Sequence, residues 1–501
     1  MNLKYKNGIM TLFLSVIATV HLYAQASQPN VLFFAFDDLS DWISPMGYQQ
    51  AKTPNFERLA ARGVTFQYAH TAGIYCAPAR TAIFTGRHAS TTGFYANHVH
   101  FALKPEIKPL QVAFSEAGYA TFGGGKLFHH SAGWIDLRGW DEFYIRSQEQ
   151  RERGWPLDSW TTEHPAMPVP YPNSKYNRTD KPTKAKWFLE WGAVLNENEE
   201  IMADTMRTNW ACKKLQQAHH KPFFLGLGLY APHFPNYVPQ KYFDMYDRDA
   251  LQPPEYLATD LEDLPEKIKK AKQSRGKIHQ HLEKIDGVKD AIHGYLASVS
   301  YADAMLGRVL DALDSGPNAD NTIIVIWSDH GYHHGQKFDW GKHTLWERTS
   351  NVPFMWAGPG IAKGKSVDTT VSLIDIYPTL LDLCSIPQVP DLDGVSMAAM
   401  LKNPKEAKDR NVLLPGMKPN EYAIINQRWR YIRYADATEE LYDVRKDPNE
   451  WTNLADTPEY AEMKTKLAAE APQTFAEEGA NFSKFKLTFK GDQYHWEKKN
   501  K

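Results

Sequence analysis

Four short apolar runs constrain the fold of this chain more than any other feature of its sequence. Each run is too short for a helix and lacks polar alternation, which indicates a strand buried on both faces. In an open α/β sheet, functional sites gather beyond the carboxyl ends of the strands. The runs cover residues 31–36, 119–122, 223–230 and 322–327, and they lead into Asp37 and Asp38, Lys126 and His129, His233, and Asp329 and His330. The sequence therefore predicts one sheet whose polar groups converge on one crevice.

Other segments have the apolar spacing of helices, and we expect these helices to cover the sheet. Residues 53–64, 295–315 and 373–383 carry apolar side chains at helical spacing. Past residue 403, strand-like segments at 422–425, 429–434 and 440–443 precede a helix around 457–470. We expect an α/β fold with a signal peptide (1–26), a main domain (27–403) and a smaller C-terminal subdomain (404–501) of antiparallel sheet plus helix.

The N-terminus has the pattern of a cleaved secretory signal. Lys4 and Lys6 precede an apolar run at 9–20, and Ala24-Gln25-Ala26 forms an A-x-A site. We therefore expect export to the periplasm or secretion. No other segment reaches 18 apolar residues and no cysteine lies near the cleavage site, so we expect no membrane anchor.

Composition bounds the partners and the redox chemistry. The 501 residues are 43% hydrophobic, which is enough for a large core. The net charge of -2 alone neither favours nor excludes nucleic acid, so we assign no nucleic-acid partner and leave the oligomeric state open. Cys76, Cys212 and Cys384 are too few for a disulfide scaffold. A Cys212–Cys384 bridge and two buried thiols both remain open, and we favour the thiols.

Residues 71–88 contain the densest motif of the chain. Cys76, Pro78 and Arg80 form C-x-P-x-R, and Thr85-Gly86-Arg87 follows after four intervening residues. Proline suits the first turn of a helix and Gly86 suits its end, so Cys76 is predicted at a helix N-terminus, where anions are favoured. Arg80 lies about one turn on and can return to the same face. The alternative is a buried cysteine at a turn.

The acidic strand ends suggest a metal site. Asp37, Asp38 and Asp329 offer hard oxygen ligands for Ca²⁺ or Mg²⁺, and His330 offers a further contact. A single Asp at a strand end is more often a helix cap, but two adjacent carboxylates repel each other unless a cation lies between them. We therefore favour a metal.

The chain resembles the type I, formylglycine-dependent sulfatases of the alkaline phosphatase superfamily, and within them most closely the iduronate-2-sulfatase branch. The resemblance covers the whole mature length, and the order of its motifs is specific. They are Phe36-Asp37-Asp38, Cys76-x-Pro-x-Arg80 with Thr85-Gly86-Arg87, Gly125-Lys126-x-x-His129, Pro232-His233, Ser328-Asp329-His330-Gly331, Trp340-Gly341-Lys342, Glu440-Leu441-Tyr442-Asp443 and Asp447-Pro448-x-Glu450. His330 stands where many sulfatases carry Asn, and the iduronate-type branch shares that histidine.

The resemblance implies an alkaline phosphatase-like large mixed sheet flanked by helices, and a sulfatase catalytic domain over 27–403. It also implies that a formylglycine-generating enzyme oxidises Cys76 to formylglycine (3-oxoalanine). A calcium ion would then be held by Asp37, Asp38, modified Cys76, Asp329 and His330.

The resemblance further implies the roles of the remaining residues. Arg80 would stabilise the hydrated aldehyde, while Lys126, His233 and Lys342 would hold sulfate oxygens. His129 would take the proton that releases sulfate, and either His233 or Lys342 would protonate the leaving oxygen. His333 and His334 lie near the metal strand and receive no role.

Three functions follow as hypotheses. The first is an exported, calcium-dependent sulfatase acting on a sulfated glycan, which the many aromatic residues suit. The second is a phosphodiesterase or phosphonate hydrolase of the same fold, and the third is a glycan-binding relative whose Cys76 is never modified. A lysine-rich segment at 266–284 is either a solvated helix face or a patch that steers an anionic polymer. The irregular stretches 145–200 and 235–290 are expected at the rim of the pocket.

Overall fold

The computed structural model describes residues 28–129, 135–144, 189–480, 484–490 and 493–499. The predicted signal peptide and most of the predicted 145–200 insertion lie outside the described residues.

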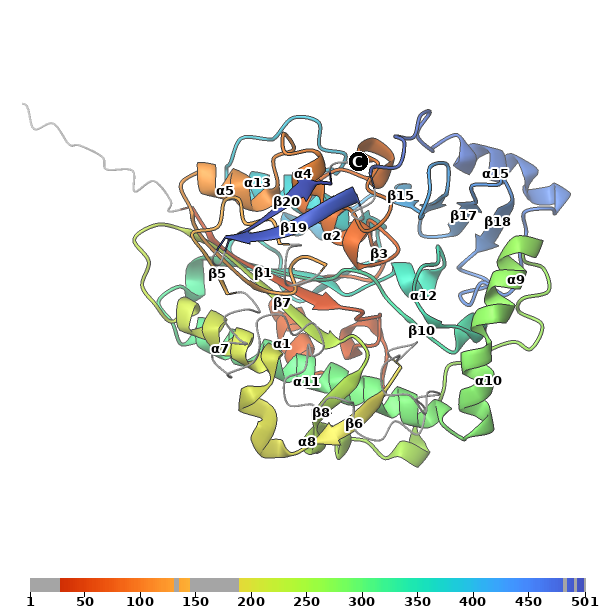
Figure 1. The fold of residues 1–501 in the computed structure, drawn as a ribbon, viewed down its shortest axis with the longest axis horizontal. Coiled ribbons are helices and arrows are strands. Elements are labelled where there is room, and N and C mark those ends of the chain that lie inside the picture. Colours follow the sequence, from red (N-terminus) through yellow and green to blue (C-terminus); the bar gives the residue numbers. More distant parts are fainter. Residues whose placement is uncertain (1–27, 130–134, 145–188, 481–483, 491–492, 500–501) are drawn as a thin grey trace, which may run out of the picture.

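An eight-stranded mixed sheet forms the centre of the molecule (Figure 1). Its strands in spatial order are β13 (Lys365–Val367), β2 (Gly63–Phe66), β12 (Phe354–Ala357), β9 (Thr322–Ser328), β1 (Asn30–Asp37), β7 (Phe223–Pro232), β4 (Ala120–Gly125) and β5 (Glu142–Tyr144). From β9 to β5 all neighbours are parallel, whereas β12 is antiparallel to both β9 and β2. The four predicted strands are confirmed, and they are the adjacent strands β9, β1, β7 and β4.

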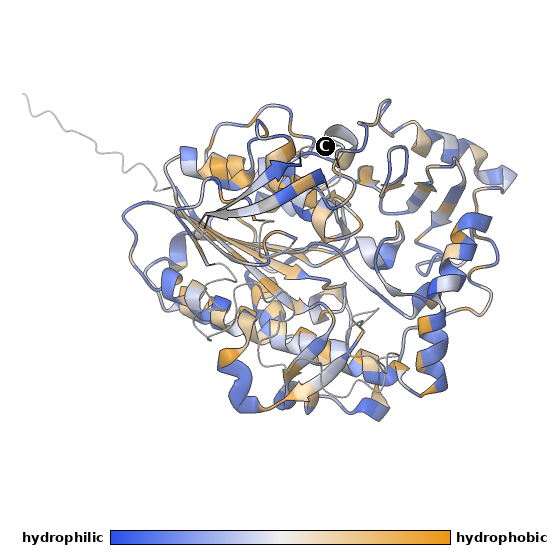
Figure 2. Ribbon diagram, viewed as in Figure 1, coloured by the Kyte–Doolittle hydropathy of each residue, from blue (hydrophilic) through white to orange (hydrophobic). Residues whose placement is uncertain are grey.

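Strand β1 demonstrates why an apolar run without alternation becomes a central strand. Val31, Phe33 and Ala35 point into one hydrophobic core, whereas Leu32, Phe34 and Phe36 point into the other. Because successive side chains of a strand point to opposite faces, both faces of β1 are covered. Figure 2 shows hydrophobic residues on the central strands, whereas α9 (Glu266–Arg275) and α10 (Lys277–Lys284) at the periphery are largely hydrophilic.

Helices cover both faces of the sheet (Figure 1). One face packs against α1 (Pro54–Arg62), α7 (Ala203–Leu215) and α11 (Val288–Asp314). The other packs against α2 (Cys76–Thr85), α5 (Leu110–Glu116) and α13 (Ile376–Leu383).

Two predicted helices differ from the observed ones at their starts. α11 begins at Val288 rather than 295, because Ala291 and Ile292 extend its buried stripe. The helix predicted from 373 is divided into a 3-10 turn (Leu373–Asp375) and α13. Pro378 therefore lies in the first turn of α13, where its missing N–H costs no hydrogen bond.

The C-terminal part contains the expected antiparallel sheet. Its strands are β15 (Val412–Pro415), β16 (Tyr422–Ile425), β17 (Trp429–Arg433) and β18 (Glu439–Asp443), followed by α15 (Ala461–Ala468). β15 was not predicted, nor was the hairpin of β19 (Phe485–Lys490) and β20 (Gln493–Lys498), which Figure 1 places apart from this sheet. The four-stranded sheet packs against Ile74, Tyr75 and Trp346, so it supports the segments that flank the functional site.

The cysteines form no disulfide in the described chain. Cys212 and Cys384 are both free thiols, as favoured from the sequence, although Cys212 is only partly buried.

Candidate active site

The motif around Cys76 folds as its residues predict. α2 begins at Cys76 after an extended Tyr75, and it ends at Gly86, whose φ of 66° suits glycine. All ten residues of α2 are buried. Cys76 therefore lies at the N-terminus of a buried helix, where the unpaired N–H groups and the helix dipole favour negative charge.

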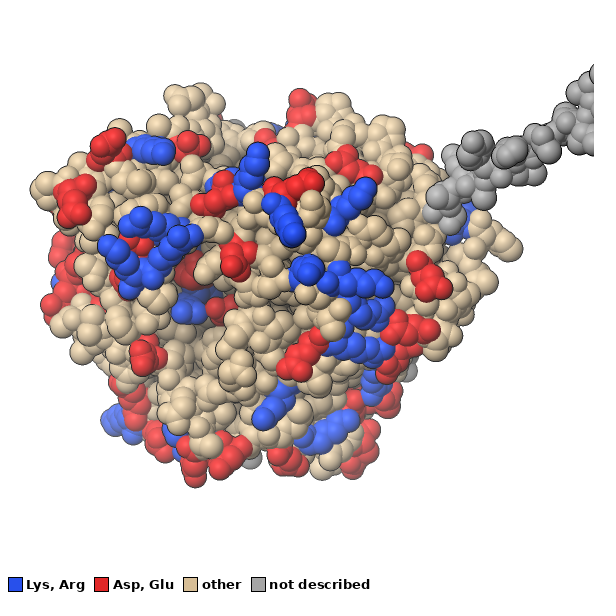
Figure 3. Space-filling view, turned by 180° about the vertical axis from the view of Figure 1, so that it is seen from behind, with Lys and Arg blue, Asp and Glu red and all other residues tan. Residues whose placement is uncertain are grey.

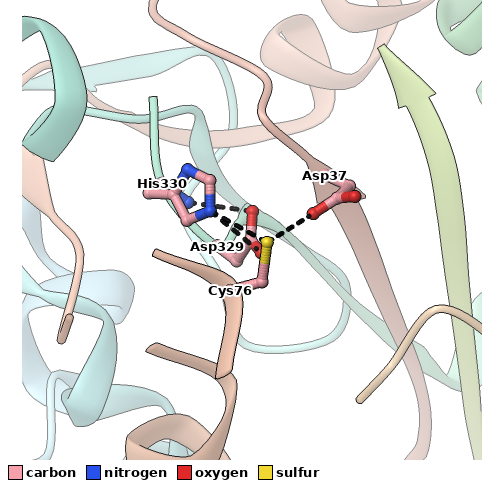
Figure 4. Close-up of side chains that lie close together, drawn as sticks. All are labelled: Asp37, Cys76, Asp329 and His330. Atoms are coloured by element: carbon pink, nitrogen blue, oxygen red, sulfur yellow. Dashed lines mark hydrogen bonds and ion pairs between the residues drawn. The ribbon is translucent and has the colours of Figure 1, made fainter. Parts of the chain in front are cut away.

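Groups from three chain segments converge on the Cys76 sulfur (Figure 4). Asp37 ends β1, Asp329 and His330 follow β9, and Cys76 opens α2. The sulfur lies 3.3 Å from His330 Nε2 and 3.5 Å from Asp37 Oδ1. One ligand atom from each of these four residues lies within 4.8 Å of the other three. The predicted convergence of the strand ends is therefore present.

Asp38 and His233 complete a second, overlapping group with Asp37 and Cys76. Asp38 has a φ of 59°, a left-handed conformation that Asp tolerates better than most residues. The Tyr295 hydroxyl on α11 donates to its carbonyl over 2.8 Å and so holds this turn. Asp38 Oδ2 is buried and accepts no hydrogen bond from the described residues, although His233 Nε2 lies 3.6 Å away.

Three cations surround the three carboxylates. Arg80 Nε lies 2.9 Å from Asp329 Oδ2, and Lys342 Nζ lies 2.6 Å from Asp38 Oδ1 and 3.3 Å from the Cys76 sulfur. Lys126 Nζ pairs with Asp37 Oδ2. The predicted residues Arg80, Lys126, His233 and Lys342 all therefore lie in this cluster, at or next to its carboxylates.

Burial and charge pairing decide the pKa values in this cluster. Burial alone would raise the pKa of Asp37, but Lys126 and the other nearby cations outweigh it and hold that pKa well below its usual value. Burial raises the pKa of the Cys76 thiol well above its ordinary value, and Asp37 adds to the shift. A neutral thiol is a weak nucleophile, so unmodified Cys76 is poorly suited to attack.

The residues fit a divalent cation. Carboxylate oxygens are the ligands that Ca²⁺ prefers, and Asp38 Oδ2 is a buried oxygen without a donor. Three carboxylates and three basic side chains balance to zero, so a divalent cation would leave the cluster at +2. Such a cluster can attract an anionic ester.

Three further histidines that the sequence singled out belong to neither of the two ligand groups found among the described residues. His129 lies three residues beyond Lys126, partly buried, and belongs to neither four-residue group. His333 and His334 are buried, and their nearest side-chain partners are Thr344 at 3.0 Å and Ser40 at 3.3 Å.

The structure reveals a supporting residue that sequence reasoning missed. Arg275 ends α9 (Glu266–Arg275), and its Nη1 donates to the Lys342 carbonyl over 3.0 Å while its Nε pairs with Asp339 at 3.2 Å. A Cβ on Gly341 would lie 2.3 Å from Arg275 Nη2, so the glycine permits this approach. The glycine between Trp340 and Lys342 was the available signal.

The lysine-rich segment has a mixed character. Lys272 is buried and pairs with Asp339, whereas Lys267, Lys269 and Lys270 are not buried. On the face drawn in Figure 3, basic side chains lie in small groups among acidic ones.

Within the part of the chain that the structure describes, no helix has the length and apolar character needed to cross a membrane.

Comparison with known proteins identifies the family. The sulfatase family model matches residues 29–386, and a model described as N-sulphoglucosamine sulphohydrolase, C-terminal, matches residues 331–476. A sulfatase of Formosa agariphila is 37% identical over 468 residues, which cover 90% of this chain and 88% of that protein.

More distant relatives have more specific names. An ulvan-active sulfatase of the same organism is 26% identical, covering 93% of this chain and 84% of that protein. Iduronate 2-sulfatase of Mus musculus is 26% identical, and the alignment covers 72% of this chain and 69% of that protein.

Solved structures agree on the fold. A phosphonate monoester hydrolase from Silicibacter pomeroyi superposes with a TM-score of 0.72 at 19% identity, covering 95% of this chain and 100% of that one. At this identity the likeness concerns the fold alone. The family match over most of the chain, together with the relative of 37% identity, establishes that the chain belongs to the sulfatase family and is a sulfuric ester hydrolase.

Proposed function

We propose that this protein is an exported sulfatase that removes sulfate from a sulfated saccharide, with formylglycine formed from Cys76 as its nucleophile and Ca²⁺ as its metal. The observation that carries the proposal is the position of the Cys76 sulfur. It lies at a buried helix N-terminus within 3.5 Å of Asp37, His330 and Lys342.

The metal would be held by Asp37, Asp38, Asp329, His330 and the oxygen of modified Cys76. When present, formylglycine supplies a hydroxyl nucleophile in its hydrated form, and the metal supplies positive charge to the sulfate oxygens. A formylglycine-generating enzyme is the partner that this modification requires.

The basic side chains supply the remaining electrostatic stabilisation. Arg80 is 1% exposed and is fixed by Asp37 and Asp329, so its charge lies at the base of the site. Lys126 and Lys342 are placed to bind the charged sulfate oxygens as negative charge develops. His129 is our proposed base for releasing sulfate, as the family resemblance implies.

The net reaction consumes one water. The S–O bond to the saccharide breaks, the saccharide oxygen takes a proton, and the water oxygen ends on sulfur. Lys342 and His233 are our two candidate donors of that proton, and their position beside Asp38 supports both. The donor can be identified with leaving groups of different basicity. Replacing it will slow hydrolysis of an alkyl sulfate more than hydrolysis of 4-nitrocatechol sulfate.

The names of the relatives support a saccharide as the substrate. An ulvan-active sulfatase and an iduronate 2-sulfatase, which align over most of their lengths, suggest a polymeric or oligomeric glycan. Residues 1–26 have the pattern of a secretory signal, which supports export. Export would bring the enzyme to a polysaccharide that lies outside the cytoplasm.

The second candidate is phosphonate ester hydrolysis. We consider it because a phosphonate monoester hydrolase shares this fold over 95% of the chain. Rates on matched aryl sulfate and aryl phosphonate esters separate the two, and a faster phosphonate reaction would reverse our preference.

The proposal is tested by comparing two buried cysteines. We expect Cys76→Ala to lower kcat/KM for 4-nitrocatechol sulfate by about 10⁴-fold or more, because the nucleophile is lost. Cys384→Ala removes another buried thiol and is expected to lower the Tm while leaving activity intact. Mass spectrometry of the peptide that spans Cys76 tests the conversion directly. Activity retained by Cys76→Ala, or an unmodified thiol in active protein, would refute the nucleophile.

A further inference from the structure

A cavity of about 390 Å³ opens close to the carboxyl edge of the sheet, and the proposed reaction does not use it. Its lining includes Asp41, Trp42, Tyr48, Glu255 and Arg348. Asp41 lies three residues beyond Asp38, so their Cα atoms are at most about 11 Å apart. The volume is that of a small-molecule site.

The polar groups of the cavity form a donor and an acceptor side by side. Asp41 Oδ2 lies 2.9 Å from Arg348 Nη1, and the two side chains remain 19% and 26% exposed. Among the described residues, Arg348 Nη2 makes one long hydrogen bond, of 3.5 Å, to Asn449 Oδ1. The Tyr48 hydroxyl accepts a hydrogen bond from Gln50 over 3.0 Å, so its own proton is available for a ligand. This arrangement suits neighbouring hydroxyl groups.

The cavity also has a rigid apolar wall. The Tyr48 ring stacks on Trp42 with centroids 4.4 Å apart and planes 7° apart, and Trp42 is buried behind it. Pro253 and Pro254 line the cavity as well. An aromatic ring with a hydroxyl tip offers an apolar body and a polar handle, which together fit the face of a sugar ring.

The charges of the cavity disfavour an anion. Asp41 and Glu255 contribute two negative charges, and Arg348 contributes one positive charge. The lining therefore has a net charge of about -1, in contrast with the catalytic cluster, which gains positive charge with a divalent cation. A sulfated or carboxylated sugar would be repelled, whereas an uncharged sugar would not.

We infer that this cavity binds an uncharged saccharide residue of the glycan on which the enzyme acts. The inference rests on the proposed function and narrows its substrate class. The glycan would carry a neutral sugar near the sulfated residue, and would not be sulfated or carboxylated at every unit.

The test measures binding without turnover. Wild-type protein is titrated with agarohexaose, xylohexaose and cellohexaose, all unsulfated, by isothermal calorimetry. We expect at least one hexaose to bind, with Asp41→Asn weakening it about tenfold or more, because a charged acceptor is lost. Tyr48→Phe, which keeps the ring stack, is expected to weaken binding about fivefold. Tyr256→Phe, a tyrosine outside the cavity, is the matched control and should bind as wild type does.

Two results would overturn the inference. One is no binding of any of the three hexaoses by protein whose thermal melt is normal. The other is wild-type affinity in both Asp41→Asn and Tyr48→Phe. Hydrolysis of 4-nitrocatechol sulfate by the same wild-type preparation tests the proposed function separately, so the failure of one does not imply the failure of the other.

Discussion

Two clusters of mostly buried charged side chains in the described part of the chain differ in how their charges are arranged. In the catalytic cluster, carboxylates from β1 and from the end of β9 point toward one another and toward the Cys76 sulfur. In the second cluster, which we name the C-terminal clamp, the acids pair with bases, as they also do in the catalytic cluster, but among the described residues they form no convergent group of ligand atoms. The clamp consists of Asp260, Lys337, Glu347, Arg430 and Glu450.

The clamp joins the C-terminal sheet to the segment that carries Lys342. Arg430 is fully buried on β17, donates to the Leu345 carbonyl over 2.6 Å, and pairs with Glu347 and with Glu450 Oε1 at 2.7 Å. Lys337 pairs with Asp260 at 2.5 Å. Among the described residues, no acid of the clamp belongs to a group of three or more convergent ligand atoms.

The comparison teaches that burial of charge does not by itself mark a functional site. Paired charges anchored to the backbone hold two parts of a structure together, and removing one partner leaves an unpaired buried charge. The acids of the catalytic cluster are paired with bases too, but their oxygens also converge with the Cys76 sulfur, and it is this convergence that indicates a cation or a charged ligand.

The largest effect is expected for Asp38→Asn, which tests whether the convergent acids of the catalytic cluster hold a metal ion. We expect it to lower kcat/KM by about 10³-fold, because a metal ligand and its charge are lost. Added Ca²⁺ should raise the Tm of chelator-treated wild-type protein, and the variant should lose that shift. Asp260→Asn, also a buried Asp, should keep the Ca²⁺-dependent shift. Equal Ca²⁺ responses in wild type and Asp38→Asn would contradict the assignment.

The next largest effect concerns the clamp. We expect Arg430→Met to lower the free energy of unfolding by about 3–5 kcal/mol, since the buried Glu450 and the partly buried Glu347 would lose their base. Urea unfolding measures the change. At a temperature where the variant is folded, its kcat should remain near that of wild type. A large loss of kcat without a loss of stability would make the clamp part of the active site.

The next prediction concerns how the free energy of unfolding depends on pH, through a buried histidine at the end of β3 (Ala69–His70). His70 is 1% exposed beside the clamp, with Nδ1 3.2 Å from Ser350 Oγ. Burial lowers the pKa of His70 to about 4, although Glu347 opposes the shift, and Arg430 adds to it. Because the unfolded chain binds the proton more tightly, this contribution is present above about pH 6.5 and is lost as the pH falls toward 4.

The loss amounts to at most about 3 kcal/mol. His70→Asn should therefore flatten the dependence of unfolding free energy on pH between about 4 and 6.5. An unchanged slope would show that His70 does not titrate differently in the folded protein.

The smallest effect concerns the link between α9 and Lys342. We expect Arg275→Ala to lower kcat about tenfold, because the Lys342 carbonyl loses its donor and the ammonium its fixed position. Gly341→Ala should act similarly by displacing the Arg275 guanidinium. The double variant should be no worse than either single one, as groups in one network are not additive. Fully additive effects would refute the positioning role.

The sequence predicts much of this fold because its signals are local. The apolar run at 31–36 must be covered on both faces, which predicts a central strand. Pro78 and Gly86 define the two ends of α2. Boundaries were less reliable where burial continued past the obvious pattern, as at the start of α11. The hairpin of β19 and β20 was missed, since a two-stranded pair has little apolar patterning to reveal it.

Local patterns along the chain reveal which residue types the site contains, and that these residues follow strands or open a helix. The packing of distant segments brings Asp37, Cys76, Asp329 and His330 within 4.8 Å of one another, and it brings Arg275 to Lys342. The physical reason is that strand and helix formation depend on neighbours along the chain. Convergence and charge pairing depend on how distant segments pack, which no local pattern encodes.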